Sequence, residues 1–196
     1  MQRVSKSLLG IAALLLVAGC RTTPVHPPVA DWPTERAARQ ALDKWEMTGR
    51  AGIKTASDGF TASLHWIQQG TTSEARIQGA LGVGGLRVRA SGDSLEIDTS
   101  KGEHIGPDEA AAELERAIGF DLPVTELRYW LLGVPAPNLE ATEELDEHGR
   151  LVRLSQQGWN LTFDRFALTH GSWLPGRIRL ERGAVRVKLV ADKWQL

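Results

Sequence analysis

The sequence predicts an α+β domain that is mainly β: a large antiparallel sheet with a pair of helices inserted between its two halves. Three observations carry this prediction. Apolar and polar residues alternate in short segments from Trp45 onward, which is typical of strands with one buried face. Glycine-containing turns separate these segments, as in an antiparallel meander. The alternation stops once, over residues 107–132, where two segments have helical periodicity.

The strands and helices can be assigned in order from these patterns. Strands are predicted over residues 45–50, 60–66, 75–80, 85–90, 94–98, 138–144, 151–157, 160–166, 177–181 and 185–194, and helices over residues 34–44, 107–118 and 124–132. A sheet of about ten strands tends to curl or close rather than stay flat. Its inner face then needs a cover or a ligand, and the inserted helices with Trp130 and Leu131 are the expected cover.

The N-terminus has the parts of an export signal in their usual order. Arg3 and Lys6 supply positive charge, residues 8–18 are apolar, and Gly19 is small. The apolar run is shorter than the ~20 residues that span a bilayer. The sequence therefore predicts a signal peptide over residues 1–19.

The last three residues of the predicted signal and the cysteine that follows them form a motif. Val17-Ala18-Gly19-Cys20 resembles the lipobox of bacterial lipoproteins, where the cysteine thiolate is the nucleophile. The resemblance implies cleavage before Cys20, a diacylglycerol on its sulfur and an acyl group on its new amine. Cys20 is the only cysteine, so an intramolecular disulfide is excluded. No other cofactor is expected.

The remaining chain divides into a tether and one domain. Residues 20–33 hold the lipidated cysteine and four prolines, which predicts an extended tether. Residues 34–196 are long enough for a single domain with its own core. That domain begins with a helix capped by Thr34. Without Arg3 and Lys6 the net charge falls from −1 to −3, so a basic surface for nucleic acid is not indicated.

The sequence lacks the common enzyme motifs. No Gly-x-Ser-x-Gly elbow and no metalloprotease helix motif occur, and Gly82-Val83-Gly84-Gly85 joins two predicted strands rather than opening a phosphate-binding helix. The acidic run around Glu143 and Asp146 is interpreted as a solvated face. An enzyme is therefore not expected, and no metal site is predicted.

Two features leave alternatives open. The seven tryptophans either fill the core or line an apolar cavity. Leu81 and Val83 are apolar residues flanked by glycines in a predicted loop, where polar turn residues are expected. This loop is either tucked against the core or forms a tip that touches a membrane or a ligand.

The order of motifs resembles the LolB family of outer-membrane lipoprotein receptors. The matching residues follow the lipobox and span nearly the whole mature chain. They are Gly49-Arg50, Leu64-His65-Trp66, Leu81-Gly82, Leu122-Pro123-Val124, Leu127-Arg128-Tyr129-Trp130-Leu131-Leu132-Gly133-Val134-Pro135, Gln157-Gly158-Trp159 and Lys188-Leu189-Val190-Ala191-Asp192-Lys193-Trp194. One difference is Ala80, where the family commonly has proline before the leucine.

The resemblance implies a half-open barrel with helices as a lid over an apolar cavity. It implies a monomer, lipid-anchored in the outer membrane and facing the periplasm, which accepts lipoproteins from the periplasmic carrier LolA and inserts them into outer-membrane lipid. The position that matches the family's membrane-insertion tip is Leu81, with Val83 beside it.

Seven residues are candidates for the acyl-chain cavity because they are large and apolar on predicted strands or the lid. They are Leu64, Trp66, Ile97, Trp130, Leu131, Leu154 and Phe163. Two other hypotheses about the function remain. An envelope-assembly scaffold would have a filled core without a lipid cavity, and a periplasmic hydrolase would need a cleft with coupled ionisable residues.

Overall fold

The computed structural model of the chain describes residues 31–79 and 84–196. Its main feature is one antiparallel sheet of eleven strands in the order β6-β5-β4-β3-β2-β1-β13-β12-β9-β8-β7. The strands of this sheet are β1 (Lys44–Lys54), β2 (Gly59–Gln69), β3 (Thr72–Gly79), β4 (Gly85–Ser91), β5 (Ser94–Thr99), β6 (His104–Ile105), β7 (Ala141–Leu145), β8 (Leu151–Gln156), β9 (Trp159–Asp164), β12 (Arg177–Arg182) and β13 (Val185–Gln195). A separate hairpin pairs β10 (Ala167–Thr169) with β11 (Ser172–Leu174).

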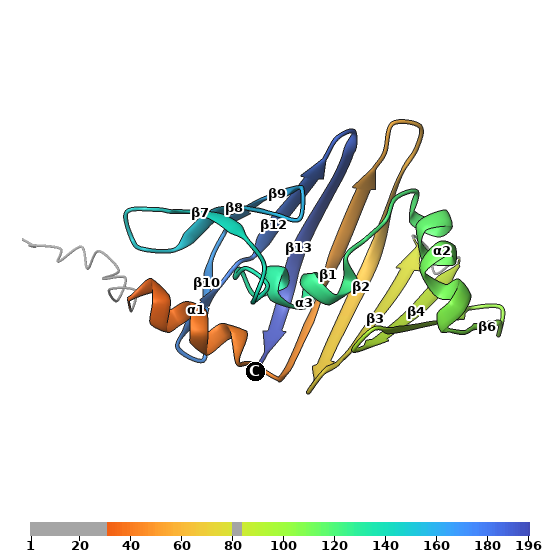
Figure 1. Cartoon of the computed structure of the whole chain (residues 1–196), viewed down its shortest axis with the longest axis horizontal. Helices are drawn as coiled ribbons and strands as arrows, with labels where there is room; N and C mark the ends of the chain where they lie inside the picture. The colour runs from red at the N-terminus through yellow and green to blue at the C-terminus, as the bar shows by residue number, and fades with distance from the viewer. Residues whose placement is uncertain (1–30, 80–83) are drawn as a thin grey trace, which may run out of the picture.

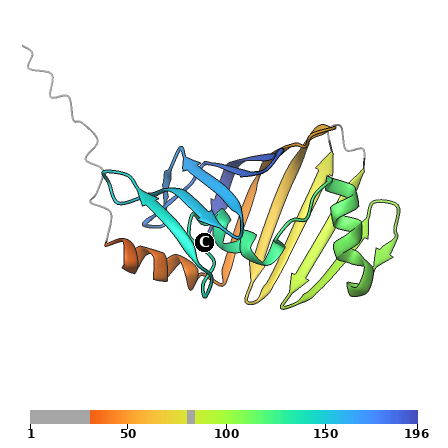
Figure 2. The same cartoon turned by 45° about the horizontal axis from the view of Figure 1, so that its top comes forward.

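The sheet consists of two meanders joined through the first and last strands. β1 to β6 form one half, and β7, β8, β9, β12 and β13 form the other. β1 pairs with β13 from Glu46↔Gln195 to Lys54↔Arg186. The sheet curls around the helices but is not closed, because β6 and β7 are its two unpaired ends (Figures 1 and 2). The predicted half-open sheet is confirmed.

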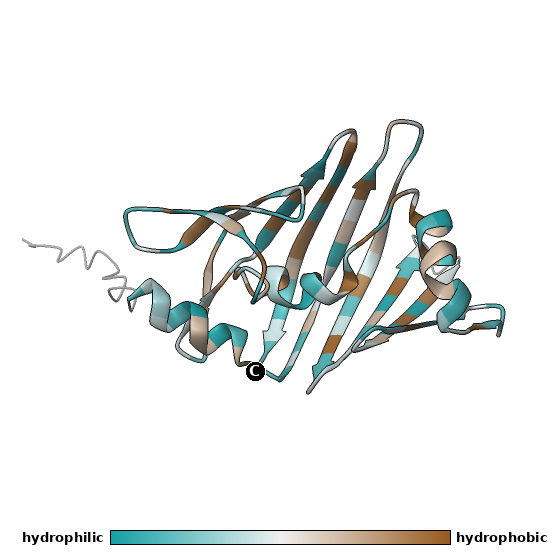
Figure 3. Ribbon diagram, in the orientation of Figure 1, coloured by the Kyte–Doolittle hydropathy of each residue, from teal (hydrophilic) through white to brown (hydrophobic). Residues whose placement is uncertain are grey.

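Burial along the strands follows the predicted alternation. On β1, Trp45, Met47, Gly49 and Ala51 are buried, and the residues that alternate with them are more exposed. On β2, Leu64 and Trp66 are buried on the same face. These buried side chains therefore share the inner face of the curl. Hydrophobic residues recur along the long strands (Figure 3).

Two helices lie between the halves in sequence and cover the inner face in space. α2 (Pro107–Ile118) and α3 (Val124–Leu131) lie in front of the sheet (Figure 1). α2 begins with Pro107 and two acids and ends at Gly119 with φ +87°, as the sequence predicts. α3 ends one residue earlier than predicted, before Gly133 with φ +70°.

The first helix differs from the prediction at both ends. α1 (Trp32–Gln40) begins after Asp31 rather than after Thr34, because Pro33 fits the first turn, where no backbone N–H is needed. It ends four residues before Lys44, which instead starts β1. α1 packs at the far end of the sheet, where Trp32 Nε1 and Arg36 Nη1 each donate to Glu143 of β7 at 2.6 Å.

Three short strands, β6, β10 and β11, were not expected, because two or three residues are too few to show an alternation. β7 also starts three residues later than predicted, after Asn138 with φ +62°. The β8–β9 turn is at the predicted place, with Gln157 at φ +51° and Gly158 at φ +73°. Positive φ at both central residues suits the twist of a two-residue hairpin.

The core has a filled part and a part that is less completely filled. Under the second meander, Trp130 packs against Trp159 at 6.5 Å between ring centroids, and Phe120 packs against Trp159 at 5.7 Å. Trp130 and Trp159 are both fully buried. Near the start of β1, Trp45 stacks on Trp66 at 6.1 Å between ring centroids and contacts Trp194 at 5.6 Å. Between these two aromatic groups lies a cavity.

Candidate functional site: an apolar cavity

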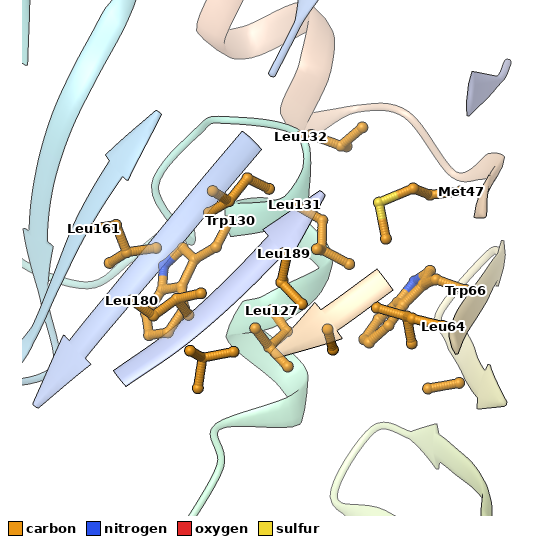
Figure 4. Close-up of a cluster of buried hydrophobic side chains, with 14 of the residues drawn as sticks. Met47, Leu64, Trp66, Leu127, Trp130, Leu131, Leu132, Leu161, Leu180 and Leu189 are labelled. Atoms are coloured by element: carbon orange, nitrogen blue, oxygen red, sulfur yellow. The ribbon is translucent and has the colours of Figure 1, made fainter. Parts of the chain in front are cut away.

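The cavity lies between the inner face of the sheet and the segment formed by α2, α3 and their connector. Its volume is about 70 Å³. The sheet contributes residues from six neighbouring strands and the helical segment contributes the roof. The lining residues are Ala51, Ile53, Leu64, Trp66, Ala75, Ile77, Val88, Leu180, Val187 and Leu189 from the sheet, and Leu114, Ile118, Phe120, Leu122, Val124, Leu127 and Leu131 from the roof. Figure 4 shows Leu127 and Leu131 next to Leu189, with Leu64 and Trp66 beyond them.

The chemistry of this lining is uniform. All the lining residues are apolar, and no polar surface faces the cavity. Ligand pockets usually add a few polar groups that orient the ligand, and they usually have volumes of ~300 Å³ or more. The cavity can therefore select for hydrocarbon but not for a headgroup, and it is too small for an acyl chain unless the roof moves away from the sheet.

Three of the seven predicted cavity residues line it. They are Leu64, Trp66 and Leu131. Ile97, Trp130, Leu154 and Phe163 are buried in the core and do not line it. Ile97 is on β5, the strand against which α2 packs. Trp130, Leu154 and Phe163 belong to the part of the core that the second meander and the Trp130–Trp159 pair fill.

The connector between the helices was not predicted to line the cavity. Phe120 and Leu122 line the cavity from this segment, although a link between helices is usually polar. The available signal was their spacing with Val124, which repeats every second residue and places apolar side chains on one side of an extended segment.

The connector is held to the sheet close to Phe120 and Leu122. Arg182, the last residue of β12, donates from Nη2 to the Asp121 carbonyl oxygen at 2.7 Å, and its guanidinium lies 4.5 Å from the Trp159 ring centroid. On the other side, a Cβ on Gly119 would lie 3.2 Å from Thr55 of the β1–β2 hairpin. The roof is thus fastened at one point and in close contact at another.

The C-terminal end of α3 is held more strongly. Gln156 is 2% exposed, and its Oε1 accepts hydrogen bonds from Trp130 Nε1 at 2.8 Å and from the Ala136 backbone N–H at 2.9 Å. Its Nε2 donates to the Ala136 carbonyl at 3.0 Å. One buried amide therefore fixes both the last turn of α3 and the loop that follows it.

α1 contacts the same loop from the outside. Gln40 Nε2 donates to the Pro135 carbonyl at 2.8 Å. Arg39 is 1% exposed, pairs with Glu35 at 3.1 Å and lies beside Gly133. Burial lowers the pKa of the Arg39 guanidinium, and the hydrogen bond to Glu35 opposes that shift.

The predicted lipidation and membrane-tip residues lie outside the described part of the chain. This applies to Cys20, Leu81 and Val83. The residues that flank the tip are described: Gly79 pairs with Ala62 of β2, and its N–H donates to the Gly84 carbonyl at 3.2 Å. Gly79 and Gly84 therefore lie toward the end of the sheet at which the β1–β2 hairpin turns.

Neither a metal centre nor a membrane-spanning helix is found among the described residues. Over residues 31–79 and 84–196, no three His, Cys, Asp or Glu side chains gather in a way that would hold a metal ion. No helix in that part of the chain is long and apolar enough to cross a membrane. The acidic run is partly structural, since Glu143 binds α1, and Asp146 accepts from Arg150 and from the His148 N–H in the β7–β8 turn.

A curled antiparallel sheet with a helical roof over an apolar cavity defines a class, the domains with the LolA/LolB fold. Solved structures share the architecture. A LolA superfamily protein from Nitrosomonas europaea superposes with a TM-score of 0.53 at 10% identity, covering 86% of this chain and 94% of that one. A DUF1329 family protein from Desulfovibrio piger gives a TM-score of 0.50 at 9% identity, covering 84% and 90%.

Sequence comparison places the chain within this class. The family model described as outer membrane lipoprotein LolB matches residues 43–194. Relatives named outer-membrane lipoprotein LolB are 35% identical in Nitrosococcus oceani, over 95% of each chain, and 34% identical in Alkalilimnicola ehrlichii, over 100% of this chain and 99% of that one. The chain belongs to the LolB family.

Proposed function

We propose that this protein accepts lipoproteins from the periplasmic carrier LolA by taking their acyl chains into the apolar cavity, and inserts them into the outer membrane. The observation that carries the proposal is the lining of the cavity, which is apolar on every side. Lipoproteins differ in their protein parts but share acyl chains. A site without polar groups accepts that shared part and ignores the rest.

The energetics explain why such a site is needed. Each CH₂ group of an acyl chain contributes ~0.8 kcal/mol when it leaves water, so an acylated cysteine does not cross an aqueous space unprotected. The roof must open for the chains to enter a cavity of about 70 Å³. The apolar surface that opening exposes is then covered by the chains themselves, which offsets the cost of opening.

The anchor has a separate role in this proposal. Cys20, acylated on its sulfur and its amine, holds the domain at the periplasmic face of the outer membrane as a monomer. Transfer runs downhill, from the carrier to this cavity and then to the bilayer, with increasing affinity for the acyl chains at each step. Equal partitioning of a lipoprotein between the purified carrier and this protein would contradict that order.

The cavity is tested by filling it. Ala75 lines the cavity from β3, and Ala75→Leu adds three carbon atoms to a space of about 70 Å³. Ala90 is equally buried on the same face of the neighbouring strand but does not line the cavity, so Ala90→Leu is the matched control. Both substitutions overpack the core, at a cost of roughly 1–3 kcal/mol each.

The readouts are uptake of a fluorescent fatty acid and acceptance of a lipoprotein from the carrier. We expect Ala75→Leu to reduce both and Ala90→Leu to leave both near the wild-type level at a similar loss of stability. Equal effects of the two variants would contradict the cavity. Absence of uptake by the wild-type protein would favour the alternative of an envelope-assembly scaffold.

A further inference from the structure

Several features that the cavity does not use lie together at one end of the strands, where two hairpins turn. At this edge the β1–β2 and β12–β13 hairpins turn side by side, with Lys54 paired to Arg186 across β1 and β13 (Figures 1 and 2). The two described neighbours of segment 80–83, Gly79 and Gly84, lie at the same edge, since Gly79 pairs with Ala62. We call residues 54–60 and 182–188 the hairpin edge.

An aromatic side chain is exposed on the inner face of the hairpin edge. Phe60 is 38% exposed, although the residues that follow it on this face of β2 are buried. It ends a cross-strand row in which Ile53 pairs with Val187 on one side and with Phe60 on the other. Because Ile53 and Val187 line the cavity, the row leads from the cavity to the exposed ring.

The same edge is hollow and basic. A groove of about 870 Å³ lies between the two hairpins, and its charged residues are Lys54, Arg179, Arg186 and Lys188 with Asp58 and Glu181. Arg186 lies 3.8 Å from Glu181, and Arg179 lies 3.0 Å from Asp164. Neither lysine has an ion-pair partner within residues 31–79 and 84–196.

We propose that the hairpin edge is a membrane-docking surface for bilayers with anionic phospholipids, with Phe60 entering the interface and Lys54 and Lys188 meeting phosphate groups. The proposal rests on the proposed function and extends it, because it specifies which side of the domain faces the membrane. An apolar ring flanked by cations on flexible stems is the combination that binds a membrane surface. Each cation near an anionic bilayer contributes about fivefold in affinity.

The exposed ring favours a membrane over an acidic protein as the partner. An acidic protein would match the lysines but would not explain why an apolar side chain at the end of the cavity row faces solvent. A bilayer matches both the lysines and the exposed ring. When the Phe60 ring enters the bilayer, the row from Val187 through Ile53 to Phe60 leads from the cavity to the acyl chains of the lipid.

The length of the tether is compatible with this orientation. The described chain begins at Asp31, eleven residues after Cys20, and eleven residues span at most ~40 Å. A strand of eleven residues such as β1 is ~36 Å long. The anchor therefore leaves the domain free to turn the hairpin edge toward the bilayer.

The test uses the mature chain with Cys20→Ser, so that no acyl anchor holds the protein to vesicles. Binding is measured to vesicles of phosphatidylcholine and of phosphatidylcholine with phosphatidylglycerol. The charge variant is Lys54→Gln with Lys188→Gln. Its control is Lys44→Gln with Lys193→Gln, which removes two exposed lysines from the opposite ends of the same two strands. Phe60→Ser is compared with Leu168→Ser, a 51% exposed leucine on the β10–β11 hairpin.

We expect the charge variant to lose roughly 25-fold in affinity for phosphatidylglycerol vesicles and little for phosphatidylcholine vesicles. Phe60→Ser should lose about fivefold for both. The two controls should bind like the parent protein. Equal losses in the variants and their controls would overturn the proposal, as would unchanged vesicle binding together with weaker binding of the charge variant to LolA, which would make the edge a protein-docking surface.

Uptake of a fluorescent fatty acid separates this proposal from the proposed function. All four variants should take up the probe normally, because none of the substituted residues lines the cavity. A wild-type protein that binds vesicles through the hairpin edge but takes up no probe would remove the proposed function and leave the docking surface intact.

Discussion

The indole Nε1 of Trp130 donates a hydrogen bond at 2.8 Å to Oε1 of Gln156, 26 residues further along the chain. This bond joins the last turn of α3 to the last residue of β8 in the filled part of the core. The same oxygen accepts from the Ala136 backbone. The end of the roof that lies away from α2 is therefore fixed, and opening must occur at the α2 end and the connector.

The first prediction concerns this fixed point. Gln156→Leu keeps a similar side-chain volume but leaves the buried Trp130 Nε1 and the Ala136 N–H without acceptors. Because buried polar groups without partners cost about 1–3 kcal/mol each, we expect the free energy of unfolding to fall by about 3 kcal/mol. Urea unfolding measures it. The control is Gln69→Leu at an exposed position at the end of β2, which should change stability by ~0.5 kcal/mol or less.

The second prediction concerns the connector. Arg182→Ala removes the hydrogen bond to the Asp121 carbonyl, the one side-chain bond that holds the connector to the sheet among the described residues. A bond to a charged donor contributes about 1.5–3 kcal/mol, and half-exposure reduces that value here. We expect uptake of a fluorescent fatty acid to accelerate about threefold to tenfold. The stopped-flow rate measures it.

A matched arginine tests whether the effect belongs to the connector. Arg116 lies on the exposed side of α2, where it pairs with Glu113. Arg116→Ala should leave the uptake rate unchanged. An Arg182→Ala protein that takes up the probe at the wild-type rate would show that the connector does not limit opening.

The third prediction concerns acid stability. Burial opposes the ionisation of Asp146, but hydrogen bonds from the Arg150 side chain and from backbone N–H groups outweigh burial and lower the pKa of this carboxyl. Since the folded pKa is below the unfolded one, the ionised Asp146 stabilises the fold above the ordinary aspartate pKa of about 3.9, and that stabilisation is lost as pH falls through the folded value.

Asp146→Asn removes this dependence on pH. At neutral pH the variant should be less stable than wild type, and the difference should shrink as pH falls below about 4. Urea unfolding at a series of pH values measures it. Glu147→Gln is the control, because Glu147 is 86% exposed in the same turn. A difference that stays constant down to acid pH would contradict the assignment.

The strands of the sheet were predictable because burial on one face leaves a period of two in the sequence. Met47, Leu64 and Val187 alternate with more polar residues in the sequence, and all three are buried on the inner face. The helix ends were predictable where glycine takes a positive φ, as at Gly119 and Gly133. In α1, the prediction at Thr34 was wrong because Pro33 fits the first turn of a helix that starts earlier.

The cavity lining was harder to predict because alternation identifies a face but not a position on that face. Leu64 and Leu154 are alike in sequence, since each is an inward leucine on a strand of the large sheet. Leu64 lines the cavity, whereas Leu154 lies in the part of the core that Trp130 and Trp159 fill. Which part is filled depends on where the roof crosses the sheet. That is a tertiary relationship, and the sequence pattern of a single strand does not contain it.

The fourth prediction concerns the last step of delivery and the segment that begins after Gly79. If Leu81 is the membrane-insertion tip, Leu81→Glu should leave acceptance from LolA intact and impair release into liposomes, because a carboxylate resists entering the acyl region. Leu168→Glu, at an exposed leucine on the β10–β11 hairpin, adds the same charge as a control and should deliver normally. The measurement is the transfer of a labelled lipoprotein into liposomes. The defect should add to that of Phe60→Ser if the tip and the hairpin edge act as separate contacts, and normal delivery by Leu81→Glu would exclude the tip.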